Sequence, residues 1–259
     1  MIGIIGGSGL YNLPGFEEKE RVVLKTPYGE PSDGYVIGSL SGKEVVFLAR
    51  HGAGHDIPPH RLNYRANIWG FSELGVERII AVNAVGGISE ELSPGDLVIP
   101  DQVLDFTNGR PSTFFDGPDV VHVDFTHPYC PEMRETFMKG AEAVGEKCHD
   151  GGVYVCTNGP RLETASEIAF FKTIGGTVVG MTGMPEAVLS REREMCYLSV
   201  SIVTNPAAGL TGKKLTTTEV VETMKDSTER LKRILVEVII RMSTKRQCPC
   251  KDALKEARL

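Results

Sequence analysis

The sequence lacks any uninterrupted apolar run close to the roughly 20 residues that a membrane-spanning helix requires, so we expect no such helix. It also lacks an excess of basic residues, because 28 lysines and arginines are outnumbered by 34 aspartates and glutamates. The resulting net charge of -6 argues against a nucleic-acid or anionic-membrane surface, since both require a basic patch. The expected partners are therefore small molecules and further copies of the chain.

No basic segment precedes the first strand-like residues, and the sequence contains neither an internal repeat nor a low-complexity linker. The first absence argues against a secretory signal, so we expect a cytoplasmic protein. The other two favour one continuous domain over residues 1–259, whose 41% hydrophobic content is sufficient for a large core.

What the sequence does contain is an alternation of short β-branched runs with helical stretches. This pattern predicts an α/β fold in which helices flank a mixed central β-sheet. We expect strands at residues 2–6, 35–40, 44–49, 78–83, 96–105, 152–157, 177–180 and 196–204. We expect helices at residues 61–74, 132–145, 164–174, from 185 onward and 220–242. Thr164 and Glu167 have the spacing of a capping box, and Pro185 suits a first helical position, just after Thr182.

Two segments fit neither pattern. Residues 107–128 combine proline, glycine, aspartate and aromatic residues in a long irregular excursion, which is typical of a functional loop or a subunit contact. Residues 243–259 are charged, and we expect them to form a solvated C-terminal helix or arm.

Six cysteines are unexpected in the cytoplasm, where thiols normally stay reduced. Cys156 and Cys196 lie in β-rich runs and fit buried apolar positions, whereas Cys248 and Cys250, which flank Pro249 in the polar tail, do not. Intracellular disulfides are chiefly a property of thermophiles, so a thermophilic source is one hypothesis.

Four turns are suited to binding an anion. The first strand runs into Gly6-Gly7-Ser8-Gly9, whose N–H groups and hydroxyl suit an oxyanion, while Asn12 in place of a third glycine disfavours dinucleotide binding. The strand at 44–49 ends in Arg50-His51-Gly52, and the planar fork of arginine suits bidentate phosphate binding.

The other two turns are Asn83-Ala84-Val85-Gly86-Gly87, after a strand, and residues 180–186, where Thr182 precedes a helix. The N-terminus of a helix favours phosphate. Each turn alone also fits a structural role, such as a tight glycine turn or a surface ion pair of Arg50. Together, the four turns favour one shared anionic ligand.

His51, His55 and His60, with Asp56, leave open a metal site and hence a metal-dependent hydrolase. The glycines at 52 and 54 argue against a helix that presents His51 and His55 on one face, so we expect no metal there. A nucleotide-binding module without catalytic activity is a second alternative from the residues alone.

Taken together, the motifs resemble those of the trimeric purine nucleoside phosphorylases and methylthioadenosine phosphorylases over nearly the whole chain. The matching motifs are Gly6-Gly7-Ser8-Gly9-Leu10, Arg50-His51-Gly52, Asn83-Ala84-Val85-Gly86-Gly87, Pro94-Gly95-Asp96, Gly159-Pro160-Arg161-Leu162-Glu163-Thr164 and Gly180-Met181-Thr182. The resemblance implies a nucleoside phosphorylase-like fold, a homotrimer or homohexamer, and inorganic phosphate as a co-substrate without a metal or an organic cofactor.

The same resemblance implies roles for individual residues. The residues expected at phosphate are Ser8, Arg50, His51, Asn83, Ala84 and Thr182. Met181 is expected to pack under the ribose, with Ala207 also at the substrate. The 5′ pocket, lined partly by a neighbouring subunit, is expected to involve His122, Thr164 and Thr218. Thermophilic relatives share the Cys-x-Cys tail, which suggests a disulfide between Cys130 and Cys196 and makes Cys248 and Cys250 further candidates for oxidation.

The base pocket departs from the methylthioadenosine branch, which the chain otherwise resembles in its length and its opening Ile-Ile-Gly-Gly. That branch carries a Thr-Asp-x-Asp run whose carboxyl recognises adenine, and this chain has Thr204-Asn205-Pro206-Ala207 instead. Glu163, 18 residues before Met181, and Asn205, 24 residues after it, match the 6-oxopurine enzymes. A carboxylate accepts from the N1–H of hypoxanthine or guanine and an amide N–H donates toward O6 or N7, whereas adenine reverses both groups.

The sequence therefore predicts phosphorolysis of inosine and guanosine to the free base and ribose 1-phosphate, by a pentosyltransferase of purine salvage. Asn205 is expected to stabilise the charge that develops on the purine, and His51 is the second residue expected in catalysis. Phosphorolysis of S-methyl-5′-thioinosine or S-methyl-5′-thioadenosine is the alternative, because neither His122 nor Thr218 excludes a methylthio group.

Overall fold

A central β-sheet forms the middle of the molecule in the computed structural model. The structure describes residues 1–7, 10, 12–211 and 217–258, and for residues 217–222 it describes only the backbone. The described strands are β1 (Ile2–Gly6), β2 (Phe16–Val22), β3 (Tyr35–Leu40), β4 (Lys43–Ala49), β5 (Arg78–Gly87), β6 (Leu97–Ile99), β7 (Gln102–Asp105), β8 (His149–Asp150), β9 (Val153–Cys156), β10 (Gly176–Gly180) and β11 (Cys196–Pro206). They pair in the order β2-β3-β4-β1-β5-β10-β9-β7, and β11 also pairs with β5 and continues the sheet through β6 to β8.

The centre of this sheet is parallel. Strands β4, β1, β5 and β11 run side by side in the same direction, so their carboxyl ends meet at one edge. β3 is antiparallel to β4, and β10 is antiparallel to the end of β5. The predicted mixed sheet is therefore confirmed, and its shared carboxyl edge is the place where ligands bind in open α/β sheets.

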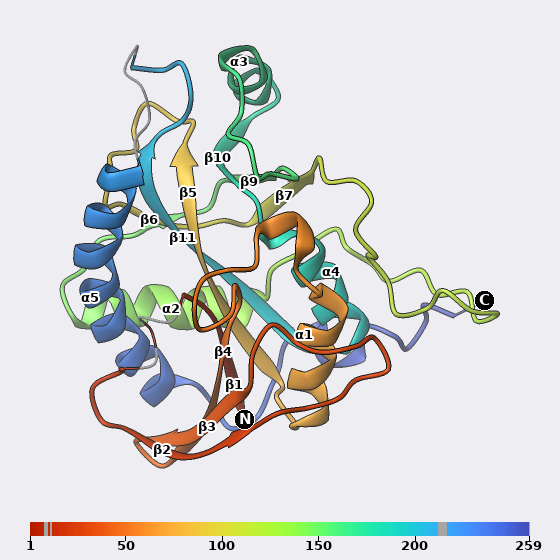
Figure 1. The fold of residues 1–259 in the computed structure, drawn as a ribbon. Helices are drawn as coiled ribbons and strands as arrows, with labels where there is room; N and C mark the ends of the chain where they lie inside the picture. The colour runs from red at the N-terminus through yellow and green to blue at the C-terminus, as the bar shows by residue number, and fades with distance from the viewer. Residues whose placement is uncertain (8–9, 11, 212–216, 259) are drawn as a thin grey trace.

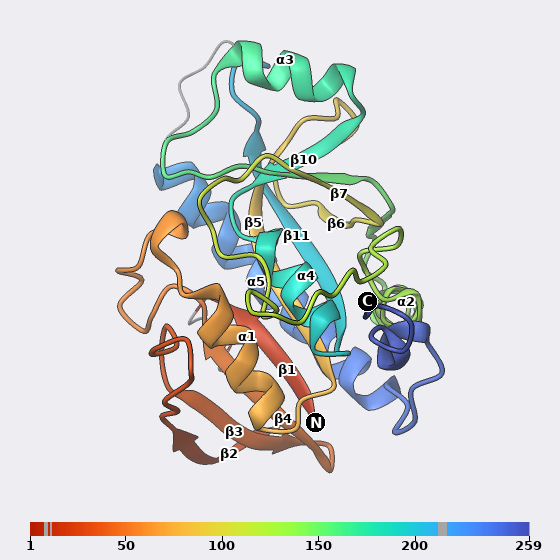
Figure 2. The same ribbon diagram turned by 90° about the vertical axis from the view of Figure 1, so that its right-hand side faces the viewer.

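Helices cover both faces of the sheet (Figures 1 and 2). They are α1 (Tyr64–Glu73), α2 (Pro131–Ala143), α3 (Ala165–Thr173), α4 (Gly183–Glu192) and α5 (Thr217–Arg241), with short 3-10 turns η2 (Pro59–Arg61) and η3 (Pro249–Asp252). Residues alternate along β5 between the faces: Ile80 and Val82 share a core with α2 and α5, while Ile79 and Ala81 share a core with α1 and α4. The predicted α/β fold is confirmed.

Two predicted strands differ from the structure. The strand expected at 78–83 continues to Gly87, because β11 pairs with it along that whole length, so the glycine-rich turn expected at 83–87 is part of β5. The strand expected at 96–105 is two strands, β6 and β7, separated by Pro100, which has no N–H to donate to a ladder. β2 and β8 were not predicted.

The helix ends largely follow the predicted signals. Thr164 caps α3 in a complete capping box: its side chain accepts from the N–H of Glu167, and the Glu167 carboxylate accepts from the N–H of Thr164. Thr182 is the N-cap of α4, as expected, but Met184 and Pro185 have non-helical dihedral angles. The regular part of α4 therefore begins at Glu186, one residue later than predicted.

The C-terminal tail is only in part the solvated helix or arm that its charge suggested, because most of its charged residues are exposed but two of its cysteines are not. Cys248 and Cys250 are both buried in the core shared with α2 and α5. Near its end, the tail lies beside the excursion at 107–128, where the N–H of His122 donates to the carbonyl of Ala257 (Figure 1). Charge did not predict this burial, because most charged residues of the tail are exposed while Cys248 and Cys250 between them are covered by the core.

The six cysteines are all free thiols in the structure, so the suggested disulfide between Cys130 and Cys196 is absent. Cys156 and Cys196 are fully buried, as predicted. None of the helices described is long and apolar enough to cross a membrane.

Candidate active site

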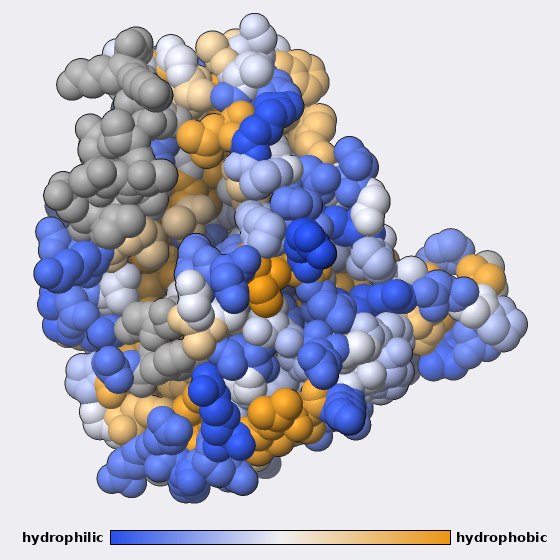
Figure 3. Space-filling model, in the orientation of Figure 1, coloured by the Kyte–Doolittle hydropathy of each residue, from blue (hydrophilic) through white to orange (hydrophobic). Residues whose placement is uncertain are grey.

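The carboxyl edge of the parallel strands opens into a cavity of about 560 Å³. Its lining includes nine of the residues predicted to bind substrates: Arg50, His51, Asn83, Ala84, Glu163, Met181, Thr182, Asn205 and Ala207. Figure 3 shows the molecular surface hollowed near the upper ends of β5 and β11, with surface coloured toward hydrophobic inside the hollow. Residues from five separate stretches of the sequence are thus brought to one site.

A smaller compartment of about 160 Å³ adjoins this cavity and shares Arg50, His51, His55 and Ala84 with it. Gly7, from the first glycine-rich turn, and Thr228, from α5, complete part of its wall. Three of the four expected anion-binding segments therefore meet at this corner, where β1 and β4 end beside Ala84 of β5. The size and polarity of the compartment suit a small anion next to a larger ligand.

Arg50 is buried at the floor of the site, with 2% of its surface exposed, and its guanidinium faces the carboxylate of Glu186. Its Nε donates to Glu186 Oε1 at 2.6 Å and its Nη2 donates to Glu186 Oε2 at 3.0 Å. Nη1 donates to the carbonyl of Val82 at 2.7 Å, and Nη2 is also 3.5 Å from the carbonyl of Ile5. The sequence led us to expect that the planar guanidinium of Arg50 binds phosphate, but its Nε and Nη2 bind Glu186 instead. One N–H of Nη1 has no acceptor among the described residues.

Glu186 thus fixes the charge state of this corner. Burial opposes the positive charge of Arg50, but the Glu186 carboxylate outweighs it and raises the Arg50 pKa above its ordinary value. The hydroxyl of Tyr197 also donates to Glu186 Oε2, at 2.9 Å. Because both charges are paired and hydrogen-bonded in the interior, Arg50 is held in one position with its charge intact.

His51 is held neutral beside this pair. Burial, followed by the positive charge of Arg50, lowers the pKa of His51 to about 4. Its Nδ1 lies 2.8 Å from the carbonyl oxygen of Ile57, which only accepts, so Nδ1 carries the proton in the neutral ring. Nε2 is then an acceptor, suited to a protonated phosphate oxygen rather than to a fully ionised one.

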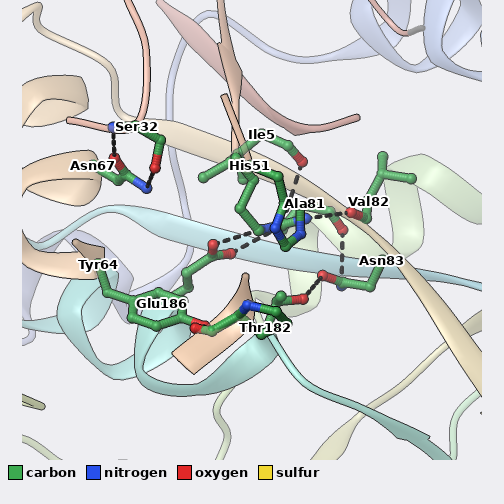
Figure 4. Close-up of polar contacts among 12 residues, drawn as sticks. Ile5, Ser32, His51, Tyr64, Asn67, Ala81, Val82, Asn83, Thr182 and Glu186 are labelled. Carbon is green, nitrogen blue, oxygen red and sulfur yellow. Dashed lines mark hydrogen bonds and ion pairs between the residues drawn. The ribbon is translucent and has the colours of Figure 1, made fainter. Parts of the chain in front are cut away.

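Asn83 and Thr182 form a short chain of hydrogen bonds on the wall of the cavity (Figure 4). The Thr182 hydroxyl donates to Asn83 Oδ1 at 2.9 Å, and Asn83 Nδ2 donates to Ser199 Oγ at 2.9 Å. All three side chains are nearly or completely buried. The chain fixes Thr182 at the N-terminus of α4, where the helix dipole favours an anion.

Glu163 and Asn205 line the same cavity as Met181, as their spacing predicts. Thr157 Oγ1 donates to Glu163 Oε1 at 2.7 Å, which leaves Oε2 available. Thr204 Oγ1 donates to Asn205 Oδ1 at 2.7 Å, and Asn205 Nδ2 donates to the carbonyl of Pro206 at 2.8 Å. Among the described residues, the site therefore has one free carboxylate oxygen and one further amide N–H to offer.

Most of the rest of the wall is apolar and suits a flat heterocycle, although His55, Asp56 and Thr204 also line it. Its apolar residues are Ile57, Pro58, Pro59, Val85, Leu162, Val179, Ala207 and Ala208. Gly159, with a φ of 62°, lies against Met181: a Cβ at this position would be 2.5 Å from the Met181 sulfur. The absence of a side chain at Gly159 therefore gives Met181 room at the cavity.

Four predicted residues are not part of this cavity in the described chain. His122 lines a separate cleft beside the tail, and Thr164 is engaged in the capping box of α3. Ser8 lies outside the described residues, and so does the side chain of Thr218, whose backbone belongs to α5. The expected 5′ pocket is thus not assembled within one described chain.

The histidines do not gather into a metal site. His51 and His55 have ring centroids 4.7 Å apart, but His60 is exposed on η2. Within residues 1–7, 10, 12–211 and 217–258, the one grouping of three or more possible metal ligands is made of cysteines. This geometry gives no support to a hydrolase built on His51, His55 and His60.

Sequence reasoning missed the residues that hold the predicted ones in place. Glu186 was seen only as a helical residue, and Tyr197, Thr157 and Thr204 were not singled out. One signal was present: Glu186 is a lone carboxylate in the apolar run Met184-Pro185-Glu186-Ala187-Val188-Leu189, where an unpaired charge is costly. Its partner Arg50 is 136 residues away, so the sequence gave no means of pairing them.

Comparison with known proteins places this geometry in context. Residues 1–240 match the family described as the phosphorylase superfamily. The 6-oxopurine nucleoside phosphorylase of Pyrococcus furiosus is 54% identical over 263 residues, covering 99% of this chain and 98% of the relative. A probable S-methyl-5′-thioinosine phosphorylase of Thermodesulfovibrio yellowstonii is 50% identical, covering 99% of this chain and 96% of the relative.

The solved structures agree at the level of the fold. A methylthioadenosine phosphorylase from an antarctic soil metagenomic library superimposes with a TM-score of 0.95 at 36% identity. The match covers 100% of this chain and 92% of the other. The relatives thus share a fold, while their names differ in the purine base and in the 5′ group of the nucleoside.

Proposed function

The chain belongs to the phosphorylase superfamily as a purine nucleoside phosphorylase, a pentosyltransferase, and from that premise we propose that its substrates are 6-oxopurine nucleosides. Inosine and guanosine would be converted with inorganic phosphate to the free base and ribose 1-phosphate, in cytoplasmic purine salvage. The single observation that carries the choice of base is the meeting of Glu163 and Asn205 in one cavity with Met181.

The hydrogen-bonding groups left free at these two residues support that choice. Glu163 Oε2 is an acceptor, which suits the N1–H of hypoxanthine or guanine. The remaining N–H of Asn205 is a donor, which suits O6 or N7. Adenine presents an acceptor at N1 and a donor at its 6-amino group, so it would leave both protein groups unpaired.

In the proposed reaction, phosphate binds at the corner formed by Arg50, His51 and Thr182 and attacks C1′ of the ribose. As the glycosidic bond breaks, the sugar becomes cation-like and the purine gathers negative charge. Asn205 donates toward that charge, so it acts where charge develops in the transition state. Met181 packs against the ribose, and no step of this scheme requires a metal or an organic cofactor.

The buried charge pair supports the placement of phosphate. Arg50 keeps its charge next to the 160 Å³ compartment, because Glu186 stabilises it. Neutral His51 offers Nε2 as an acceptor to the hydroxyl of a monoprotonated phosphate. One charge and one acceptor together select phosphate in the form that predominates near neutral pH.

A second candidate substrate is S-methyl-5′-thioinosine, which carries the same base. It is favoured by one observation: the predicted 5′ residue His122 lies in a separate cleft, so none of the described residues that line the cavity is assigned to select a hydroxyl over a methylthio group. We propose that the chain forms a homotrimer or homohexamer, in which a neighbouring copy supplies His122 to the 5′ side of the site.

The reaction type can be tested by following base release from inosine with and without inorganic phosphate. Phosphorolysis predicts hypoxanthine and ribose 1-phosphate in equal amounts, only when phosphate is present, and unchanged rates after treatment with a chelator. Release of free ribose without phosphate would instead identify a hydrolase. Binding without any turnover would identify a nucleotide-binding module.

A further inference from the structure

Four cysteines from distant parts of the sequence meet in the interior, away from the active-site cavity. Cys130 is the N-cap of α2, Cys196 is the first residue of β11, and Cys248 and Cys250 flank Pro249 at η3 in the tail. Their four sulfur atoms all lie within 4.8 Å of one another, and each residue is buried. None of them lines the cavity that contains Glu163 and Asn205.

The spacing of the sulfurs fits four ligands around one ion better than two covalent bridges. A disulfide brings two sulfurs to about 2.05 Å, whereas Cys196 and Cys248 are 3.3 Å apart and all six cysteines are free. Zinc–sulfur bonds of about 2.3 Å place the sulfurs of a tetrahedral site about 3.8 Å apart. That separation lies between the 3.3 Å pair and the 4.8 Å limit of the cluster.

A buried positive charge beside the cluster lacks a full set of partners. Arg78 on β5 is paired in register with Cys196 on the parallel strand β11, so the two side chains leave the sheet on the same face. Arg78 is 3% exposed, and its Nη2 has no hydrogen-bond partner among the described residues. Glu132 is 3.5 Å from that Nη2, an ion-pair contact that is too long for a good hydrogen bond.

Glu132 also ties the tail to the same place. Its Oε2 accepts from the N–H of Gln247 at 2.8 Å and from the N–H of Cys248 at 3.0 Å. The carboxylate is thus shared between Arg78 and the start of the Cys-x-Cys segment. A negative charge at the sulfurs would be stabilised by Arg78, whose two carboxylate neighbours, Glu132 at 3.5 Å and Glu77 at 3.8 Å, lie beyond good hydrogen-bond distance.

We propose that Cys130, Cys196, Cys248 and Cys250 form a structural site for a divalent zinc ion. Zinc displaces one proton from each of the four thiols, which gives a complex with a net charge of -2 next to Arg78. All four ligands come from the protein, so the site is closed to substrate and its role is structural. A cleft of about 960 Å³, lined in part by Cys250, gives a route by which the ion reaches the sulfurs.

The consequence of this site is the placement of the tail. The zinc joins the tail to α2 and β11, and beyond it the tail contacts the excursion through Ala257 and His122. Binding of the metal therefore contributes to the folding free energy of both segments. The proposal does not depend on the choice of nucleoside, because the zinc site and the cavity share no residue.

The first test is the zinc content of the full-length chain, purified without chelators and without exposure to air, measured by inductively coupled plasma mass spectrometry. We expect close to one zinc per chain. In Cys250→Ser the zinc content should fall at least about tenfold, because one of the four ligands is lost. Cys148→Ser is the matched control, since Cys148 is outside the cluster, and it should keep its zinc.

A second measurement keeps the test decisive if Cys250→Ser does not fold. Cobalt added to the metal-free wild-type chain should give the intense visible bands of a tetrahedral thiolate complex and a thiolate-to-cobalt charge-transfer band. Alkylation and mass measurement of the same wild-type preparation report the thiols. Two disulfides among the four cysteines, or four reactive thiols without bound metal, would overturn the proposal.

Discussion

Asn205 is the residue on which the proposed choice of base depends most directly. In Asn205→Asp the amide donor becomes a carboxylate, which repels O6 and accepts from the 6-amino group of adenine. The ratio of kcat/KM for inosine to that for adenosine should therefore shift toward adenosine by at least about tenfold, the equivalent of roughly one hydrogen bond. Steady-state kinetics with both nucleosides at saturating phosphate measure this ratio.

The matched control is Gln102→Glu, the same change from amide to acid at an exposed side chain outside the cavity. It should leave the ratio unchanged. If Asn205→Asp also leaves the inosine-to-adenosine ratio of kcat/KM unchanged, Asn205 does not determine which base the enzyme prefers.

His51, in the corner where we propose that phosphate binds, makes the stability of the protein depend on pH. Its pKa in the folded chain is about 4, below its ordinary value of 6.5, because it is buried and lies next to Arg50. The unfolded chain therefore binds this proton at a higher pH than the folded chain does. The contribution of His51 to the free energy of unfolding is therefore fully present above about pH 6.5. This contribution is lost as the pH falls toward about 4.

His51→Asn should remove this contribution, because its amide still donates to the Ile57 carbonyl but does not titrate. Denaturant unfolding at about pH 7 and about pH 5 measures the loss of stability on acidification, which should be smaller in His51→Asn than in the wild type. His60→Asn, at an exposed histidine, should lose as much as the wild type does. Equal losses in all three proteins would contradict the assigned pKa.

At the residue scale, the sequence predicted which side chains line the site and missed how they are held. Arg50 was expected to face phosphate with its whole fork, but Glu186 takes two of its N–H groups. That partnership joins β4 to α4 and has no local sequence signal. Motifs record side chains that touch a ligand, whereas the residues that orient them depend on the fold.

Helix α3 is the element that sets the position of Glu163. Its N-cap, Thr164, directly follows Glu163 and forms a complete capping box with Glu167. Thr164→Ala should lower the free energy of unfolding by about 1 kcal/mol and should raise KM for inosine, since the segment that carries Glu163 loses its anchor. Denaturant unfolding and steady-state kinetics measure the two effects.

Thr173→Ala makes the same substitution at the other end of α3, where the hydroxyl donates to the carbonyl of Ala169. It should change the stability by less than about 0.5 kcal/mol and leave KM unaltered. Similar effects of the two substitutions would show that the cap does not position Glu163.

At the element scale, prediction was best where burial makes the pattern simple. β1 and β3 span the predicted residues, because both are short runs made mostly of buried apolar residues and glycine. β2, with the sequence Phe-Glu-Glu-Lys-Glu-Arg-Val, was missed because it is a charged and largely exposed edge strand. Its pairing with β3 is made by backbone hydrogen bonds, and the pattern of side chains along the sequence does not predict such bonds.

The C-terminal tail shows the opposite error at the same scale. Its charge predicted a solvated arm, yet Cys248 and Cys250 are in the core. Their partners Cys130 and Cys196 lie far earlier in the chain, so spacing alone did not connect the four. The Cys-x-Cys pair was the one signal present, and its meaning became clear only with the fold.

At the scale of the whole molecule, one chain brings together most of the described residues proposed to bind base and phosphate, but not His122, which is proposed for the 5′ side. His122 lies on the excursion, beside the tail and apart from the cavity. A site shared between copies predicts a stable oligomer, with a mass about three or six times the 28.2 kDa of the chain. Sedimentation velocity at micromolar concentration measures this mass, and a fully active monomer would contradict the shared site.

The comparison of inosine with adenosine in the wild-type enzyme tests the central claim most directly. With phosphate saturating, kcat/KM for inosine should exceed that for adenosine by about 10²-fold or more, because Glu163 and Asn205 pair with hypoxanthine and are left unpaired by adenine. Equal values, or a preference for adenosine, would contradict the assignment of the cavity to 6-oxopurines.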